Sequence, residues 1–213
     1  MNAPRPLAIL GGTFDPIHNG HLRGAWEAAE ALDAEVRMVP ARTPPHRPPP
    51  MADVAGRVAL LRAALAGQDR LVLDTRELDR DGPSYTVDTL ASLRAEIGPD
   101  RPLVLLVGAD AFAGLASWHL WQDLFGLAHI GVLTRPGGHH ALPAELAAFV
   151  EGRRTPRLHG PAGQVIDISI TPLDIAATAI REAFAAGYEP RFLMPETCFA
   201  DPALLAPYRS PDL

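Results

Sequence analysis

The chain of 213 residues contains no lysine, because all 19 of its basic side chains are arginine. This absence excludes a P-loop nucleotide site, a protein kinase site and a Schiff-base enzyme, each of which needs a lysine amine. Any phosphate that the chain binds must therefore be contacted by arginine, histidine, backbone N–H groups or a metal ion. The abundance of Ala, Arg, Pro and Gly favours GC-rich coding as the cause of the missing lysine.

Other scarcities narrow the class further. The single cysteine, Cys198, excludes an internal disulfide framework. No apolar run approaches the roughly 18 residues of a membrane span, and the first ten residues carry no signal-peptide pattern. The net charge of -6, without a basic stripe, argues against nucleic acid as the main partner. We therefore expect a cytoplasmic protein with no membrane partner.

Strands and helices alternate along the predicted chain. With 47% hydrophobic residues, the length fits one domain over residues 1–213, with a C-terminal helical part from about residue 174. Expected strands cover residues 7–10, 35–39, 71–73, 103–107, 129–133 and 165–170. Expected helices cover residues 20–32, 54–65, 86–97, 142–150 and 178–186. This order predicts an α/β, Rossmann-like fold with an open, mostly parallel sheet and helices on both faces.

The first strand runs directly into the segment Gly11–His21, where an open α/β sheet binds ligands. Gly11 and Gly12 permit a tight turn and close approach of a ligand to the backbone. His18 and His21 lie three residues apart at the start of a helix, so both imidazoles can face the same side. A helix N-terminus binds anions, which predicts a phosphate site. A metal site is the competing interpretation, but no carboxylate lies at ligand spacing, so no metal-binding residues are predicted.

This segment resembles the Gly-Gly-Thr-Phe-Asp-Pro-x-His-x-Gly-His signature of the nucleotidyltransferase superfamily at every fixed position. The resemblance implies the fold of that superfamily and in-line adenylyl transfer, with His18 and His21 as catalytic residues at the triphosphate. It also implies that Asp15 supports the loop. The implied ATP-binding residues are Gly11, Gly12, Thr13, Phe14, Gly20, His46, Arg47, Gly108, Asp110, Ile175 and Thr178.

Further motifs follow in a fixed order along the chain: Thr43–Arg47, Arg76–Leu78, Pro83–Thr86, Gly108–Asp110, Trp118-His119 and Arg135–Gly137. Together they resemble the bacterial nicotinate-nucleotide adenylyltransferases of NAD synthesis. The resemblance implies that ATP and nicotinate mononucleotide are the partners and that Mg²⁺ is the cofactor. It implies that Thr86, Trp118, His119 and Arg135 bind the nicotinate nucleotide. Trp118 would supply a flat face for the pyridine ring.

A second phosphate motif near the C-terminus departs from the superfamily pattern at one position. It resembles Ile-Ser-Ser/Ala-Thr-x-x-Arg, but Ala176 stands where the first serine is usual. Loss of a helix cap typically costs about 1 kcal/mol, and Asp174 is an alternative cap. Arg181 keeps the arginine position, and the resemblance makes it the third catalytic residue, at the β- and γ-phosphates.

Three alternatives remain open at this point. Phosphopantetheine adenylyltransferase shares much of the first motif but usually has threonine where His18 stands, and lysines in the phosphate site. A non-catalytic nucleotide-binding relative would fit Ala176. The chain could also prefer the amide, nicotinamide mononucleotide. Oligomeric state stays undetermined, as do roles for His129, His139, His140 and His159. Trp26 and Trp121 are interpreted as packing residues, and a final helix is expected beyond Glu196.

Overall fold

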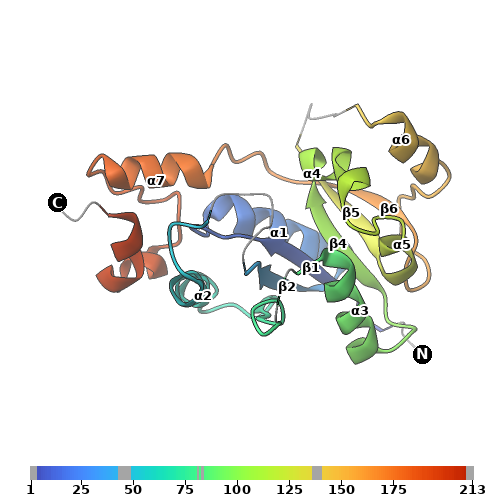
Figure 1. The fold of residues 1–213 in the computed structure, drawn as a ribbon, viewed down its shortest axis with the longest axis horizontal. Helices are drawn as coiled ribbons and strands as arrows, with labels where there is room; N and C mark the ends of the chain where they lie inside the picture. Colours follow the sequence, from blue (N-terminus) through green and yellow to red (C-terminus); the bar gives the residue numbers. More distant parts are fainter. Residues whose placement is uncertain (1–3, 43–48, 81, 83, 136–140, 210–213) are drawn as a thin grey trace.

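The computed structural model describes residues 4–42, 49–80, 82, 84–135 and 141–209 (Figure 1). At its centre lies a six-stranded sheet in the order β3-β2-β1-β4-β5-β6, and every pair of neighbours is parallel. The strands are β1 Leu7–Gly12, β2 Glu35–Pro40, β3 Leu71–Leu73, β4 Leu103–Gly108, β5 His129–Thr134 and β6 Val165–Ser169. The predicted Rossmann-like sheet is therefore confirmed.

Helices cover both faces of the sheet, as expected. They are α1 Asn19–Leu32, α2 Val54–Ala64, α3 Thr86–Ile97, α4 Ala109–Ala113, α5 Leu124–Leu127, α6 Ala144–Val150 and α7 Ala177–Ala185. Three 3₁₀ helices follow the same order: η1 Leu115–Ser117, η2 Glu196–Phe199 and η3 Pro202–Tyr208. In Figure 1, α1, α2 and α7 lie toward the left of the sheet, and α3 to α6 lie toward the right.

Alternation along the strands separates two hydrophobic clusters. In β1, Ala8 and Leu10 belong to the cluster that also contains buried residues of α1, α2, α7 and the C-terminal 3₁₀ helices. Leu7 and Ile9 point the other way, into the cluster formed with α3, α4, α5 and α6. Successive residues of a strand face opposite sides, so this pattern is what a sheet buried on both faces requires.

The strand order reverses between β1 and β4, which are neighbours although two strands and their helices separate them in sequence. At such a switch point the connections after the two strands leave toward opposite sides, and a crevice opens beyond their carboxyl ends. Gly12 ends β1 and Gly108 ends β4. The two motifs that contain these glycines are therefore brought to one edge of the sheet.

The C-terminal part differs from the single final helix that we expected beyond Glu196. Two 3₁₀ helices form instead, and Pro207 lies inside the second. Proline lacks the N–H that an α-helix interior uses, so a continuous α-helix cannot pass through this position. Both 3₁₀ helices pack against α2, and η3 also contacts α7. The short helices α4, α5 and η1 were also not expected from the sequence.

Most predicted boundaries agree with the structure to within two residues. The helix expected from residue 142 begins at Ala144, and the strand expected to reach residue 170 ends at Ser169. The proline-rich stretch after β2 contains no helix or strand in its described residues. Among the residues that the structure describes, no helix is long and apolar enough to cross a membrane.

Candidate active site

The loop between β1 and α1 folds back over the end of its strand. Phe14 has a positive φ of 49° and is buried, and the Asp15–Pro16 peptide bond is cis. A Cβ added to Gly12 would lie 2.8 Å from Cε1 of Phe14, so the aromatic ring requires glycine there. At Gly11 an added Cβ would meet nothing within 4 Å. Intramolecular packing thus explains Gly12, while the ligand-approach role of Gly11 stays a prediction.

His18 and His21 form a stacked pair at the N-terminus of α1. Their ring centroids are 3.7 Å apart with an interplanar angle of 24°, as the spacing of three residues predicted. The Phe14 ring meets His21 edge-on at 5.2 Å. Neither Nδ1 atom has a hydrogen-bond partner among the described residues. The pair therefore presents two imidazoles side by side at a helix end suited to anions.

Burial keeps both imidazoles neutral at pH 7. Removal from water, and then the nearby Arg135 guanidinium, lower the pKa of His18 from 6.5 to about 4. Removal from water, and then His18, lower the pKa of His21 to about 3. A neutral imidazole donates one N–H and accepts at its other nitrogen. The positive charge at this site must therefore come from arginine and from the helix end rather than from histidine.

Asp15 joins the loop to two distant parts of the chain. Its carboxylate accepts hydrogen bonds from the backbone N–H groups of Met51 and Ala52, at 2.8 and 3.1 Å. The Tyr208 hydroxyl donates to the same carboxylate at 2.9 Å. Asp15 is 8% exposed, so these contacts are made inside the protein. These hydrogen bonds are the means by which Asp15 can support the loop, as the resemblance implied.

Arg57 on α2 forms hydrogen bonds with the backbone of the loop. Its side chain is 1% exposed. One terminal nitrogen donates to the carbonyl oxygens of Thr13 and Ala41 at 2.7 and 2.8 Å, and the other donates to that of Arg42 at 2.9 Å. A single guanidinium thus connects the histidine loop with the segment that follows β2.

Arg181 reaches the loop from α7. Its guanidinium donates to the backbone carbonyl oxygen of Asp15 at 2.6 Å and to the Thr178 hydroxyl at 3.3 Å. The helix begins at Ala177, and its N-cap residue Ala176 makes no side-chain cap hydrogen bond. The alternative cap at Asp174 is therefore wrong: the helix begins three residues after Asp174, and its N-cap is Ala176. The helix end keeps uncapped N–H groups.

The two phosphate motifs lie against one another. A Cβ added to Gly20 would lie 3.0 Å from Nδ1 of His18 and 3.6 Å from the Cβ of Ile175. Ile175, the first residue of the second motif, is therefore packed beside the first helical turn of α1. The glycine leaves room for the imidazole as well as for this contact.

The end of β4 carries a second small cluster. A Cβ at Gly108 would lie 2.7 Å from a carboxylate oxygen of Asp110, so glycine is needed for that carboxylate to fold back. Asp110 is exposed in the first turn of α4. Arg135, just after β5, is exposed and near enough for its charge to affect His18. The strand ends thus bring carboxylate and guanidinium groups to the same edge as the histidines.

The residues expected to bind the pyridine ring lie on separate elements. Tyr85 precedes α3, and its ring packs against that of His119 with centroids 4.3 Å apart, tilted by 37°. This contact brings Thr86, the first residue of α3, near His119. Trp118 is half-buried against the hydrophobic cluster that β1 forms with α3, α4, α5 and α6, so it is partly a packing residue. His119 is exposed, which leaves its ring open to solvent.

Two predicted ATP-binding residues, His46 and Arg47, lie outside the described residues. So do His139 and His140 among the unassigned histidines. His129 is buried, contacts the Gly160 carbonyl oxygen and accepts from the Gln164 N–H, so its role is structural. Within the described ranges, no three His, Cys, Asp or Glu side chains gather to bind a metal ion.

Sequence reasoning missed three residues that organise the loop: Asn19, Arg57 and Tyr208. The backbone and side-chain N–H groups of Asn19 donate to the carbonyl oxygens of Leu193 and Phe192, both at 2.8 Å. The only sequence signal for Arg57 is its place inside the apolar pattern of α2. Nothing in the sequence pairs Asn19 or Tyr208 with residues so distant along the chain.

Known proteins with similar sequences match almost the whole chain. Residues 9–183 match the family described as cytidylyltransferase-like. A probable nicotinate-nucleotide adenylyltransferase of Pseudomonas syringae pv. tomato is 46% identical over 213 residues, covering 98% of this chain and 96% of the relative. A second, of Marinobacter nauticus, is 49% identical over 193 residues, covering 88% of this chain and 89% of that one.

The fold also resembles that of a solved enzyme. Plasmodium falciparum nicotinic acid mononucleotide adenylyltransferase, complexed with NaAD, superposes with a TM-score of 0.69 at 16% identity. The match covers 96% of each chain. Identity this low supports the shared fold only, and it agrees with the predicted nucleotidyltransferase architecture.

Proposed function

The chain belongs to the cytidylyltransferase-like family and, within it, to the nicotinate-nucleotide adenylyltransferases, and we propose that it transfers the adenylyl group of ATP to nicotinate mononucleotide. The products are nicotinate adenine dinucleotide and pyrophosphate. A phosphate oxygen of the mononucleotide attacks the α-phosphorus of ATP. The bond from that phosphorus to the oxygen bridging to the β-phosphorus breaks in line, and no covalent enzyme intermediate forms.

The stacked pair of His18 and His21 is the observation that carries the proposed chemistry. We propose that each neutral imidazole donates one N–H to phosphate oxygens of the reacting group, where charge increases in the transition state. The N–H groups that open α1 would add their dipoles to the same site. Because the imidazoles are neutral, they would act as hydrogen-bond donors rather than as positive charges.

Positive charge would come from guanidinium groups. Arg181 is already oriented by the Asp15 carbonyl oxygen and Thr178 hydroxyl, so it loses little side-chain freedom when the β- and γ-phosphates bind. Arg135 would serve the nucleotide phosphate from the end of β5. This division agrees with the absence of lysine, since a fork of N–H donors suits phosphate oxygens.

The end of the site near α3 would bind the nicotinate ring. We propose that Trp118 and His119 lie against the ring and that the first N–H groups of α3, beginning at Thr86, donate to its carboxylate. This arrangement would favour the acid over the amide, because a helix N-terminus interacts more strongly with a negative charge. Asp110 would accept a hydrogen bond from a ribose hydroxyl.

We propose that ATP is used as its Mg²⁺ complex. The described residues contain no metal-binding cluster of His, Cys, Asp and Glu, so phosphate oxygens and water would hold the ion. Bound there, it would neutralise charge on the leaving pyrophosphate.

One assay tests this function. Purified protein with ATP and Mg²⁺ is offered nicotinate mononucleotide, nicotinamide mononucleotide and phosphopantetheine in parallel, and both pyrophosphate and the dinucleotide products are measured. We expect the fastest turnover with nicotinate mononucleotide and none with phosphopantetheine. If neither nicotinate mononucleotide nor nicotinamide mononucleotide gives a dinucleotide product, the proposed function is rejected. Equal kcat/KM for the two substrates would reject the preference for the acid.

A further inference from the structure

The C-terminal segment, residues 186–209, contacts the histidine loop at two places, one on each side of His18. Before the pair, Tyr208 of η3 reaches the carboxylate of Asp15. Immediately after His18, the backbone and side-chain N–H groups of Asn19 donate to two carbonyl oxygens in the segment between α7 and η2. His18 thus lies between two residues that are attached to the last part of the chain, and His21 follows two residues after the second.

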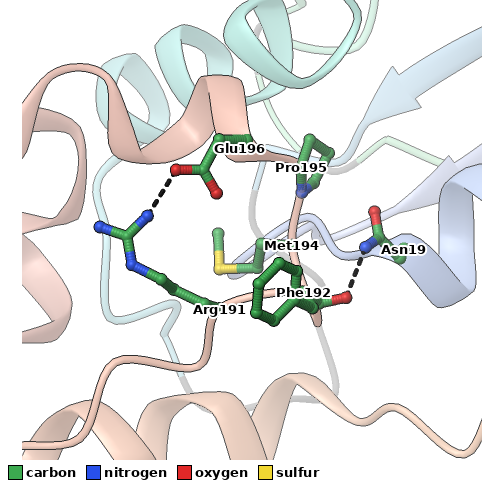
Figure 2. A pocket seen from close by; sticks show the side chains of 6 residues that line it. All are labelled: Asn19, Arg191, Phe192, Met194, Pro195 and Glu196. Atoms are coloured by element: carbon green, nitrogen blue, oxygen red, sulfur yellow. Dashed lines mark hydrogen bonds and ion pairs between the residues drawn. The ribbon is translucent and has the colours of Figure 1, made fainter.

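The second attachment borders a pocket of about 540 Å³ shown in Figure 2. Asn19 points across it to the Phe192 carbonyl oxygen, and Met194 lies at its base. The Arg191 guanidinium that lines the pocket is paired with Glu189 and Glu196. Two carboxylates thus compensate the charge of this guanidinium, and the hydrogen bonds of Asn19 at the pocket attach the start of α1 to the C-terminal segment.

The first attachment is the more sharply defined of the two. Tyr208 is 3% exposed, and its ring packs near Phe184 of α7 with centroids 6.2 Å apart. The hydroxyl donates to Oδ1 of Asp15, the oxygen that also accepts from the Ala52 N–H. Burial, and then the Asp15 carboxylate, raise the pKa of the Tyr208 hydroxyl, so it remains a donor at neutral pH.

Asp15 is connected to both sides of the site through different atoms. Its carboxylate accepts hydrogen bonds from the Tyr208 hydroxyl and from two backbone N–H groups. Its backbone carbonyl oxygen accepts a hydrogen bond from the Arg181 guanidinium. A rotation of the Asp15 backbone would therefore move both the loop that carries His18 and the orientation of Arg181. Inside a protein such a hydrogen-bonded group has a strongly preferred position, because each lost partner leaves a buried polar group unsatisfied.

We propose that Tyr208 is a positioning residue for adenylyl transfer: by holding the Asp15 carboxylate it sets the loop that presents His18, His21 and Arg181 to the triphosphate. The proposal rests on the proposed function for its kinetic consequence. Tyr208 contacts none of the reacting atoms and acts only through Asp15. The C-terminal segment is then part of the active-site architecture rather than an appendage to it.

Tyr208→Phe tests the proposal, because it removes the hydroxyl and keeps the ring that packs in the core. We expect kcat to fall about tenfold while KM for nicotinate mononucleotide changes less than twofold, since displacing the reacting groups slows the step without removing substrate contacts. The matched control is Tyr188→Phe, the same change at a tyrosine that is 72% exposed, and it should retain the wild-type kcat.

A double-mutant cycle assigns the effect to the contact. In an Asp15→Ala background the hydroxyl has lost its acceptor, so adding Tyr208→Phe should lower kcat by less than twofold further. If Tyr208→Phe lowers kcat by the same factor in the Asp15→Ala background as in the wild-type background, the proposal is overturned. A Tyr208→Phe variant with wild-type kcat, or one that changes KM alone, would also overturn it.

Amide hydrogen exchange separates this proposal from the proposed function, because it needs no substrate. Tyr208→Phe should speed exchange at Met51, Ala52 and residues 14–22 about tenfold, while Tyr188→Phe should not. Unchanged exchange overturns the positioning role even in an active enzyme. If the wild-type protein forms no dinucleotide, the function fails, and faster exchange in Tyr208→Phe still supports the structural link.

Discussion

The two ends of the proposed active site are built differently. At the phosphate end, comprising residues 12–21 and Arg181, residues 14–18 are buried, and side-chain hydrogen bonds connect the loop to α2, α7 and η3. At the pyridine end, comprising residues 85–86 and 118–119, Tyr85 and His119 are exposed and their rings pack against one another. Leu120 beside them is 54% exposed with a positive φ of 49°.

The difference corresponds to what each end has to do. Stabilising the charge of a phosphoryl transition state depends on donors that are already in place, because any reorganisation during the reaction raises the barrier. Recognition of a flat ring tolerates adjustment, and exposed aromatic side chains can close on it when it binds. We therefore expect the phosphate end to govern kcat and protein stability, and the pyridine end to govern KM.

The largest expected effect is at His21. His21→Ala removes a donor from the phosphate end, and loss of one transition-state donor typically lowers kcat by about 10²–10³. Steady-state kinetics with saturating substrates measure the change, and circular dichroism should show an intact fold. The control His159→Ala changes an exposed histidine outside the site and should keep the wild-type kcat. A His21→Ala enzyme of normal kcat would mean that the pair is structural.

Arg57 tests the stability of the same end. Arg57→Met keeps the length and apolar stem but removes the donors to three carbonyl oxygens. The variant loses hydrogen bonds from a charged group and leaves buried carbonyl oxygens without a donor. We therefore expect the free energy of unfolding, measured in urea, to fall by about 3 kcal/mol. Arg62→Met on the same helix changes an exposed side chain and should stay within about 0.5 kcal/mol of wild type. Equal losses would remove the special role of Arg57.

The buried histidines make the phosphate end sensitive to acid. Their pKa values in the folded protein, about 4 for His18 and about 3 for His21, lie below the value of 6.5 expected when unfolded. Below pH 6.5 the unfolded chain therefore binds protons that the folded chain does not, and stability falls as pH falls. Between pH 7 and pH 5 we expect a loss of about 2 kcal/mol for each histidine.

Urea unfolding across this range measures the loss, and the buried His129, whose pKa is also lowered, adds to it in the same direction. A double variant, His18→Asn with His21→Asn, should lose clearly less stability than wild type over the same interval. Identical slopes for the two proteins would show that the pair is not held neutral by burial. The pKa of Glu96 is lowered from 4.5 to about 2, so the stability that this carboxylate contributes is lost mainly below pH 4.5, outside the interval measured.

Local sequence patterns were enough to predict the scaffold and the pair of imidazoles at the phosphate end. The apolar run of β4 is typical of a strand buried on both faces, and the spacing of His18 and His21 predicted that both imidazoles lie on one side of a helix. Arg57 and Tyr208 could not be found in this way. The acceptors of Arg57 lie 15, 16 and 44 residues away, and Asp15 lies 193 residues from Tyr208, so these contacts follow from tertiary packing rather than from any periodicity.

The C-terminal 3₁₀ helices were within reach of the sequence, since Pro202 and Pro207 disfavour a regular helix there. Neutrality of the histidines was not, because it depends on how much water the folded loop excludes. The positions that escaped prediction are thus those that attach the phosphate end to the rest of the fold.

The smallest expected effect is at the pyridine end. Tyr85→Leu removes the ring that packs on His119, and such aromatic contacts contribute about 0.5–1.5 kcal/mol. If His119 helps to bind nicotinate mononucleotide, its KM should rise about threefold to fivefold while kcat and the KM for ATP stay within twofold. Tyr188→Leu, at an exposed tyrosine outside the site, should leave all three unchanged.

The split between kcat and KM decides the result. A fall in kcat after Tyr85→Leu as large as that after His21→Ala would mean that the exposed tyrosine is needed in the transition state. The two ends would then act as one preorganised unit, and low exposure would no longer mark the groups that accelerate the reaction. A rise in KM alone means instead that the enzyme confines its rigid contacts to the phosphates, where charge changes, and lets the ring be held by side chains that adjust around it.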